Sequence, residues 1–243
     1  MDRLGYTAMT AASRTMASMQ VRANNLANSS TPGFRADIEN AEAVAVEGYG
    51  YDSRHLAQVR NSGVSSASGT LMHTGRDLDV AIQGAGMYVV EGLDGQERYT
   101  RHGALQVDAE LRLTVGGRPL LGEGGPIVLP EYDSLHIGRD GTVSVVPRGD
   151  FVTAEVDRIR IVDADAAALT KDVDGLLKLE EDQQAQAVEE PLLASGYLES
   201  SNVMAIEQLM ASMSLSRLFE TQVKMMKAAE QLSDAGNRMI RGS

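Results

Sequence analysis

The sequence contains no cysteine and no tryptophan, and aromatic residues make up only 4% of its 243 positions. Without cysteine, the chain can form neither a disulfide nor a thiolate metal site. This absence suits a protein that is exported unfolded and then sits in an oxidising compartment. Because aromatic residues are few and there are 12 methionines, we expect much of the burial to come from small and flexible side chains.

Basic residues are also scarce, since 22 lysines and arginines stand against 34 acidic residues and give a net charge of −12. A nucleic-acid groove needs a basic patch, so this balance argues against nucleic acid as a partner. Residues 1–35 carry +3 and residues 214–243 carry +2, which leaves −17 in between. Two interpretations stay open: either these are solvated faces only, or the basic ends meet acidic segments of neighbouring subunits, and assembly then depends steeply on salt.

Long hydrophobic runs are missing too. No run is long enough to span a membrane, and residues 10–18 are mostly Ala, Ser and Thr around Arg14, unlike the apolar segment of a secretory signal peptide. We therefore expect no transmembrane segment. With 43% hydrophobic residues, the chain still has enough apolar material for one large domain or two smaller ones.

A first helix is predicted over residues 1–28. Small and apolar residues recur there at spacings of four and three, at Gly5, Met9, Ala12, Met16, Met19, Ala23 and Leu26. The helix should end near Asn28, because asparagine side chains compete for backbone hydrogen bonds and Pro32 disfavours the helical conformation of Thr31. Pro32-Gly33 is then a turn signal.

The middle of the chain predicts extended structure. Residues 29–76 are interrupted by glycines and serines and are interpreted as an extended, hairpin-like β connector, with a mobile linker as the alternative. Residues 77–180 show a two-residue period and predict an antiparallel β domain, with strands expected at 111–115, 127–129 and 158–162. Hairpin turns are expected at Asp94-Gly95, Asp140-Gly141 and Asp174-Gly175. Residues 181–199 are acidic and rich in glutamine, which indicates the outgoing part of the connector.

A second, longer helix is predicted from Ser201 to Ile240 within the terminal segment 200–243, with Ser200 or Ser201 as its cap. Its apolar residues form two stripes that change phase near residues 214–217. The first stripe comprises Val203, Ile206, Met210 and Met213, and the second comprises Leu215, Leu218, Met225, Ala229, Leu232, Gly236 and Met239.

These elements together predict an α+β fold. The second helix could lie in a globular core, but that requires an apolar partner, and the only other long seam is at residues 5–26. We therefore expect the N- and C-terminal helices (1–28 and 200–243) to form a coiled-coil layer, the connectors 29–76 and 181–199 to form an extended β layer, and 77–180 to form an inserted antiparallel β domain.

Enzyme chemistry finds little support. The four histidines are scattered without metal-binding spacing, and no serine lies in a nucleophile-elbow pattern. Gly84-Ala85-Gly86 lacks the rest of a dinucleotide fingerprint and is interpreted as a turn. Asp77 and Asp79 could bind a cation, although a salt bridge to Arg76 or Arg101, or simple exposure to solvent, is the favoured interpretation. We expect no catalytic residue, no metal site and no cofactor.

Several motifs occur in the order of a known family. They are Ala23-Asn24-Asn25-Leu26-Ala27-Asn28 followed by Thr31-Pro32-Gly33-Phe34-Arg35, then residues 78–84, then Tyr99-Thr100-Arg101-His102-Gly103, and finally Leu198-Glu199-Ser200-Ser201-Asn202-Val203. Together they resemble the flagellar basal-body rod and hook proteins, which are axial proteins. The opening Met1-Asp2-Arg3 and residues 6–13 are most similar to the proximal-rod type of that family.

The resemblance implies a structural subunit of the bacterial flagellar rod, located within the periplasm and transmitting torque, which leaves the cell through the type III export channel without a cleaved signal. Expected partners are other copies of the chain, neighbouring proximal and distal rod proteins, the export apparatus and a surrounding basal-body ring. The residues expected to carry assembly are Met9, Ala12, Met16, Met19, Ala23, Leu26, Val203, Ile206, Met210, Met213, Leu218, Met225, Leu232 and Met239. The family-motif residues expected to fix the chain's exit from the helical layer are Asn24, Asn25, Leu26, Asn28, Thr31, Pro32, Gly33, Phe34 and Arg35, joined by Ser201, Asn202 and Val203.

Two alternatives stay open. One is a distal-rod or hook subunit of the same family. The other is a monomeric periplasmic or extracellular binding module, whose pocket would need the aromatic side chains Tyr88, Tyr99 and Tyr132 of the β domain.

Overall fold

The computed structural model describes residues 2–45, 55–149, 151–172, 174–179 and 183–241. The chain divides into two compact units. The helical unit comprises residues 1–27, 39–60 and 204–243, and the β unit comprises residues 28–38 and 61–203. Both units are therefore assembled from segments that lie far apart in the sequence.

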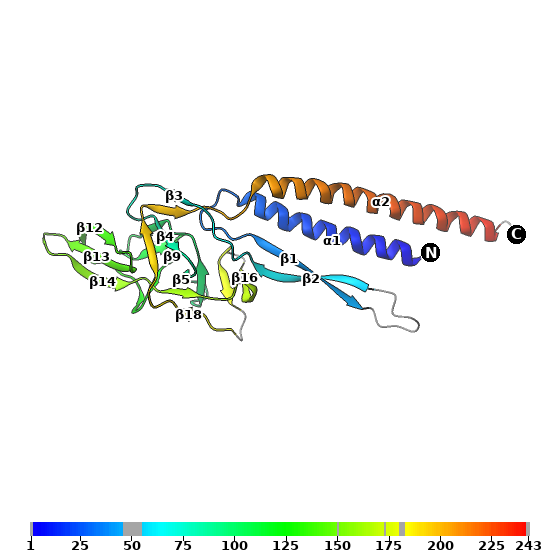
Figure 1. Ribbon diagram of the computed structural model, residues 1–243. Coiled ribbons are helices and arrows are strands. Elements are labelled where there is room, and N and C mark those ends of the chain that lie inside the picture. Colours follow the sequence, from blue (N-terminus) through cyan, green and yellow to red (C-terminus); the bar gives the residue numbers. More distant parts are fainter. Residues whose placement is uncertain (1, 46–54, 150, 173, 180–182, 242–243) are drawn as a thin grey trace. The chain divides into compact units, whose positions relative to one another are not determined.

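Two antiparallel helices, α1 (Asp2–Ala27) and α2 (Ala205–Arg241), lie side by side in the helical unit (Figure 1). Both predicted helices are confirmed, and the many antiparallel strands between them confirm the α+β class. α1 ends at Ala27, where the Asn28 carbonyl accepts a hydrogen bond from the Thr31 N–H at 3.1 Å. The pairing of α1 and α2 as a coiled coil stays a prediction.

The start of α2 differs from the prediction, because neither serine caps the helix. Ser200 Oγ lies 2.9 Å from Thr70 Oγ1, and Ser201 Oγ accepts a hydrogen bond from the Val203 N–H at 3.2 Å. The helix begins later, at Ala205, and its first carbonyl is that of Met204, which accepts the Gln208 N–H at 3.1 Å. Both hydroxyls are engaged before the helix begins, that of Ser200 with Thr70 and that of Ser201 with the Val203 N–H, so neither is available to cap α2.

Three strands occupy the predicted connector between residues 29 and 76. They are β1 (Asp37–Ala45), β2 (His55–Val64) and β3 (Leu71–His73). β1 and β2 form a two-stranded sheet, as the hairpin-like interpretation predicts and the linker alternative does not. The glycines at 48 and 50, which suggested an interruption, lie outside the described residues.

The remaining strands belong to the β unit, and every pairing described for them is antiparallel. They are β4 (Val80–Gln83), β5 (Met87–Glu91), β6 (Glu97–Thr100), β7 (Leu105–Val107), β8 (Leu113–Val115), β9 (Arg118–Pro119), β10 (Leu121–Gly122), β11 (Gly125–Pro126), β12 (Tyr132–Ile137), β13 (Thr142–Pro147), β14 (Ala154–Arg158), β15 (Ile161–Asp163), β16 (Leu169–Lys171), β17 (Leu177–Leu179), β18 (Gln186–Ala187), β19 (Leu192–Ser195) and β20 (Tyr197–Glu199), with a short 3-10 helix η1 (Ala166–Ala168) before β16.

The strands form several small sheets around two clusters of buried hydrophobic residues. The largest has six strands in the order β16-β17-β6-β5-β15-β18, and two more have the orders β12-β13-β14 and β7-β8-β9. β4 pairs with β19, β3 with β20, and β10 with β11. Residues 181–199, predicted as an outgoing connector, thus contribute β18, β19 and β20, which pair with strands from much earlier in the chain.

All three predicted hairpin turns are confirmed. They join β5 to β6, β12 to β13 and β16 to β17, and the glycine of each turn has positive φ: 73° at Gly95, 87° at Gly141 and 76° at Gly175. Glycine adopts this conformation at little cost.

Three predicted strands need correction. Leu111 has a φ of 61° and belongs to a turn closed by Asp108, whose Oδ1 accepts the Arg112 N–H at 2.7 Å, so β8 starts at Leu113. Residues 127–129 form only an isolated bridge, between Val128 and Arg112, instead of the predicted strand. The Ile127 carbonyl accepts the Leu113 N–H, and the Ile127 N–H donates to the Leu120 carbonyl. The strand expected at 158–162 is split, because the backbone leaves β14 after Arg158 and joins the six-stranded sheet at Ile161.

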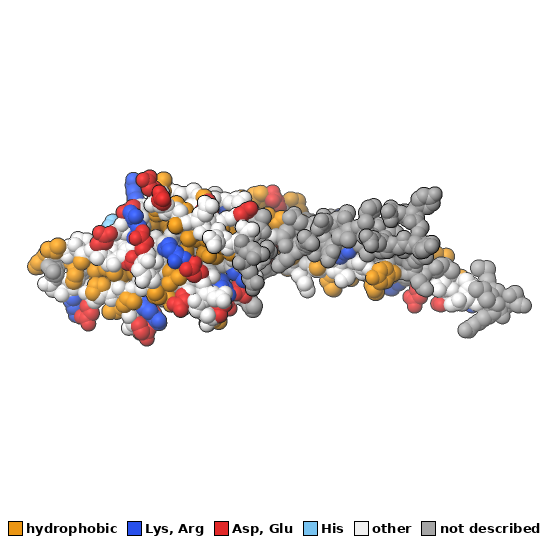
Figure 2. Space-filling view, turned by 90° about the horizontal axis from the view of Figure 1, so that it is seen from below, with side chains coloured by type: hydrophobic (Ala, Val, Ile, Leu, Met, Phe, Trp, Pro, Cys, Tyr) orange, Lys and Arg blue, Asp and Glu red, His pale blue; other side chains and the backbone are white. Residues whose placement is uncertain are grey.

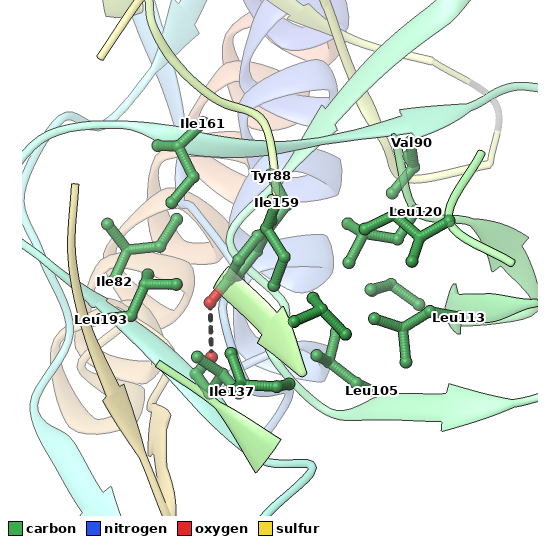
Figure 3. Close-up of a cluster of buried hydrophobic side chains, with 14 of the residues drawn as sticks. Ile82, Tyr88, Val90, Leu105, Leu113, Leu120, Ile137, Ile159, Ile161 and Leu193 are labelled. Atoms are coloured by element: carbon green, nitrogen blue, oxygen red, sulfur yellow. Dashed lines mark hydrogen bonds between the residues drawn. The ribbon is translucent and has the colours of Figure 1, made fainter. Parts of the chain in front are cut away.

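The core of the β unit is almost entirely aliphatic (Figure 3). Tyr88 is its one aromatic member and is fully buried, with its hydroxyl donating to the Val80 carbonyl at 2.7 Å. Burial raises the pKa of the Tyr88 hydroxyl well above its usual range. Tyr99 is also buried. Two of the three tyrosines that a ligand pocket would need are therefore part of the protein interior.

Candidate functional site

The motifs quoted above meet at one place in the β unit, where residues 31–36, 99–103 and 198–202 lie against one another. The turn after α1 is closed by hydrogen bonds from the Phe34 N–H to the Thr31 carbonyl (3.3 Å) and from Thr31 Oγ1 to Asn28 Oδ1 (3.2 Å). The polar and Pro-Gly residues that predict the end of the first helix therefore build the turn that follows it.

Gly33 lies at the centre of this junction. Its N–H donates to the Glu199 carbonyl at 2.8 Å, and its φ is 69°. A Cβ atom there would lie 2.4 Å from the Arg101 carbonyl carbon and the His102 nitrogen. His102 Nδ1 in turn lies 3.1 Å from the Pro32 carbonyl oxygen. Only glycine fits, because both its conformation and its surroundings exclude a side chain.

Two arginines share one buried carboxylate at the same junction. Arg35 Nη2 lies 3.0 Å from Glu199 Oε1, and Arg101 Nε lies 2.8 Å from Glu199 Oε2. The side chains of Arg101 and Glu199 are each 2% exposed. The Gly69 N–H also donates to Glu199 Oε1 at 2.8 Å. The carboxylate is therefore fully engaged, and each of the three motifs supplies one of its charges.

The two arginines carry one more charge than Glu199 neutralises. Arg101 offsets this excess by donating to backbone carbonyls of the β4–β5 connection, including that of Gly84 at 3.0 Å. Burial lowers the pKa of the Arg35 guanidinium, while the Glu199 carboxylate opposes that effect. Breaking one side of such a buried ion pair typically costs about 3–5 kcal/mol, because a charge is left without a partner.

Asn202 links three segments of the β unit, because it bonds to residues 34–36 and to Ala67. Its Oδ1 accepts the Ala36 N–H at 2.8 Å, and its Nδ2 donates to the Ala67 carbonyl at 2.8 Å. Its own N–H reaches the Phe34 carbonyl at 3.3 Å. An asparagine is suited to this position because its side chain carries both an acceptor and donors.

Lys171 of β16 contacts both Phe34 and Asp37. Its Nζ lies 3.7 Å from the centre of the Phe34 ring and 2.8 Å from Asp37 Oδ1. Burial lowers the pKa of Lys171, and the Asp37 carboxylate opposes that effect. The motif phenylalanine thus makes a cation–π contact with a lysine that comes from β16.

The predicted assembly residues differ from one another in how far they are buried within one chain. Ala12 is buried, Met19 and Leu26 are half-buried, Ala23 is exposed, and Met239 lies outside the residues whose side chains are described. Val203, which precedes α2 and belongs to the β unit, is also buried. The other predicted assembly residues are large and between 45% and 73% exposed: Met9, Met16, Ile206, Met210, Met213, Leu218, Met225 and Leu232.

The residues of α1 and α2 that are buried within one chain are mostly small or polar. Ala8, Ala12 and Thr15 are buried on α1, and Gln208, Gln222 and Ala229 are buried on α2. Arg22 Nη1 also donates to Gln208 Oε1 at 3.3 Å. Folding of one chain therefore leaves most of the large apolar side chains of both helices uncovered.

The sequence did not predict the partners of several residues of the junction, and Arg101, considered as a partner of Asp77 or Asp79, pairs with Glu199 instead. Arg101, His102 and Glu199 stand in the quoted motifs, yet no pattern showed that they meet, because the segments are about 65–170 residues apart. Lys171 carried no signal at all. Asp79, considered for a cation, instead lies 3.8 Å from Arg76 Nη1, which is one of the ion pairs that the sequence suggested.

Comparison with known proteins places these motifs in a family. Family models match residues 6–35 (Flagella basal body rod protein), 81–145 (Flagellar hook protein FlgE/F/G D1 domain) and 194–239 (Flagellar basal body rod FlgEFG protein C-terminal). The flagellar basal-body rod protein FlgF of Salmonella typhimurium is 39% identical over 248 residues, covering 99% of both chains. The chain belongs to the family of flagellar basal-body rod proteins.

Other relatives refine the placement within this family. The FlgF protein of Escherichia coli is 38% identical, again over 99% of both chains. The FlgG protein of Bacillus subtilis is 30% identical over 88% of this chain and 90% of its own. The chain is therefore most like FlgF, and it is a structural subunit of the flagellar basal-body rod.

Two further observations complete the description of the site. Among the residues that the structure describes, no group of three or more histidine, aspartate or glutamate side chains is placed to hold a metal ion. No helix in that part of the chain is both long and apolar enough to cross a membrane.

Proposed function

We propose that this rod subunit polymerises through its two terminal helices and that the resulting shaft transmits torque across the periplasm. The observation that carries the proposal is the exposure of large apolar side chains on both helices. Leu218, Met225 and Leu232 of α2 are 49%, 45% and 57% exposed, and Met9 and Met16 of α1 are 55% and 54% exposed.

The spacing of these side chains supports helix packing between subunits. The three α2 residues recur every seven positions, as do Met9 and Met16, and seven residues are close to two helical turns. Each set therefore lies on one side of its helix. Burying a side chain of this kind contributes up to about 1.5–3 kcal/mol, so burial of these side chains between subunits favours assembly.

The junction supports the same function because its interactions make the subunit rigid. Its buried ions and the bonds of Asn202 fix the course of the chain close to both points where it leaves the β unit. A subunit that transmits torque requires a junction that does not unfold locally. The junction holds no group placed for catalysis, and we propose that the protein catalyses no reaction.

The proposed partners follow from the family. They are further copies of the chain, other rod proteins on the proximal and distal sides, the type III export apparatus and a surrounding ring of the basal body. The likeness to FlgF favours a proximal position in the rod.

The test is a charged substitution on the exposed stripe. Leu232→Asp should abolish incorporation into the rod, because the aspartate would be buried without a partner between subunits. Incorporation is measured by isolating basal bodies from a strain that makes only the variant, and folding is checked by circular dichroism of the purified chain.

The matched control is Gln231→Asp, which adds the same charge one residue away at an exposed position. We expect it to assemble. Normal incorporation of Leu232→Asp would refute polymerisation through this stripe.

A further inference from the structure

The connection between β13 and β14 carries two exposed hydrophobic residues. Phe151 is 99% exposed and Val152 is 68% exposed. Figure 2 shows hydrophobic side chains gathered at the end of this hairpin, away from the core. A phenylalanine held in water forgoes about 1.5–3 kcal/mol that burial would provide. These residues, here called the hairpin tip, have the properties of a binding element.

A groove lies elsewhere in the β unit, between β19 and the turn that joins β12 to β13. Its volume is about 470 Å³. Its lining mixes apolar and polar side chains, and among them Leu192 is 60% exposed and Tyr197 37% exposed. Ile137, His136 and Arg139 close the other side.

The tip and the groove lie at opposite ends of the same sheet. The Arg139 carbonyl accepts the Leu193 N–H at 2.8 Å, which fixes the β12–β13 turn at the groove. The tip follows the other end of β13, whose six residues span about 20 Å at roughly 3.4 Å per residue. A chain therefore cannot place its own tip in its own groove.

The charges of the two surfaces are complementary. Glu131 and Glu155 flank the tip, Asp150 immediately precedes Phe151 in the sequence, and Arg148 lies 3.8 Å from Glu131. The groove is lined by Arg139, and no acidic residue is among its described lining residues. The acidic residues near the tip would thus meet a groove whose described lining includes Arg139 and no acidic side chain.

We propose that the tip of one copy of this chain inserts into the groove of the next copy, with Phe151 against Leu192 and Tyr197. This inference rests on the proposed polymerisation and adds a second contact to it, outside the helices. Because two different surfaces meet, the contact is head-to-tail, and repetition of such a contact between identical subunits gives an open helix or a ring.

The absence of native cysteine allows a direct test. The double variant Phe151→Cys with Leu192→Cys is polymerised at full length and then oxidised mildly. We expect a ladder of covalent dimers, trimers and longer species on a non-reducing gel, because every chain offers one thiol at each end of the contact. Each single variant should give dimers at most.

A mutational arm uses Phe151→Asp, with Leu93→Asp as its control. Leu93 is 80% exposed in the β5–β6 turn, so both substitutions remove an exposed apolar side chain from a hairpin of the same unit. We expect the yield of sedimentable polymer to fall at least tenfold for Phe151→Asp and to be unchanged for Leu93→Asp.

The outcomes separate this contact from the proposed function. If the double variant polymerises but gives no species longer than a dimer, the tip does not occupy this groove, while polymerisation through the helices stands. Normal polymerisation of Phe151→Asp would overturn the inference in the same way. If the unmodified chain itself forms no polymer, both proposals fail.

Discussion

At the scale of single residues, the carboxylate of Glu199 has the most consequential environment. It is buried and accepts from two arginines that come from different motifs. The family motifs therefore have a physical meaning here: they supply the ions and the glycine of one junction. Replacement of any of these charged side chains should lower the free energy of unfolding of the β unit.

We predict that Glu199→Gln lowers the free energy of unfolding of the β unit by about 3 kcal/mol or more, because Arg35 and Arg101 would be left as buried cations without a counter-charge. Urea denaturation followed by circular dichroism measures this loss. The matched control is Glu97→Gln, which removes an ion pair with Arg160 at a position that is 45% exposed. Exposed pairs contribute about 0–1 kcal/mol, so equal losses for the two variants would contradict the assignment.

At the scale of elements, turn chemistry was the most reliable signal. Asp-Gly pairs predict three hairpins, and all three occur, because glycine accepts the positive φ that these turns require. Strand limits were less predictable. Leu111 continues an alternating pattern, yet Asp108 closes a turn around it, so a local side-chain bond overrides the strand pattern.

The β12–β13 hairpin predicts a pH effect. Hydrogen bonds from the Thr142 hydroxyl and N–H, with a smaller contribution from Arg158, lower the pKa of Asp140 to about 2. Since the unfolded value is higher, the carboxylate stabilises the fold above about pH 4, and this stabilisation is lost as the pH falls from about 4 to 2.

Asp140→Asn should therefore cost up to about 1 kcal/mol at pH 6, an amount kept small by exposure of the group. The difference from the unsubstituted chain should vanish toward pH 2, as measured by urea midpoints at several pH values. A difference that stays constant over this range would show that the charge is not the stabilising feature.

At the scale of the whole molecule, charge is unevenly distributed along the chain. Residues 1–35 and 214–243 carry a net positive charge, while the rest carries −17. If the basic ends meet acidic segments of neighbouring subunits, the attraction adds to helix packing.

We therefore predict that polymer yield falls when salt is raised from about 0.05 to about 0.5 M, because the Debye length then shortens to roughly 4 Å. Sedimentation at a fixed protein concentration measures the yield. A yield that is unchanged or rises with salt would favour the alternative in which these charges are solvated faces and assembly is hydrophobic.

The sequence by itself determined the local features of this protein. The helical period gives α1 and α2, the Asp-Gly pairs give the turns, and the unbroken motif from Ala23 to Arg35 gives the family. Each depends on neighbours in the chain, whose dihedral preferences and spacing are visible without a fold. The end of α1 near Asn28 is predictable for the same reason.

Only the tertiary structure decided which distant residues meet and which side of each helix is covered. Glu199 finds Arg35 and Arg101 through strand pairing, which no local pattern encodes. Met9 and Leu232 follow helical spacing as core residues would, yet Ala12 and Gln208 lie in the contact between α1 and α2, because small and polar side chains let the two backbones approach within one chain. The large apolar side chains are thereby left on the outside.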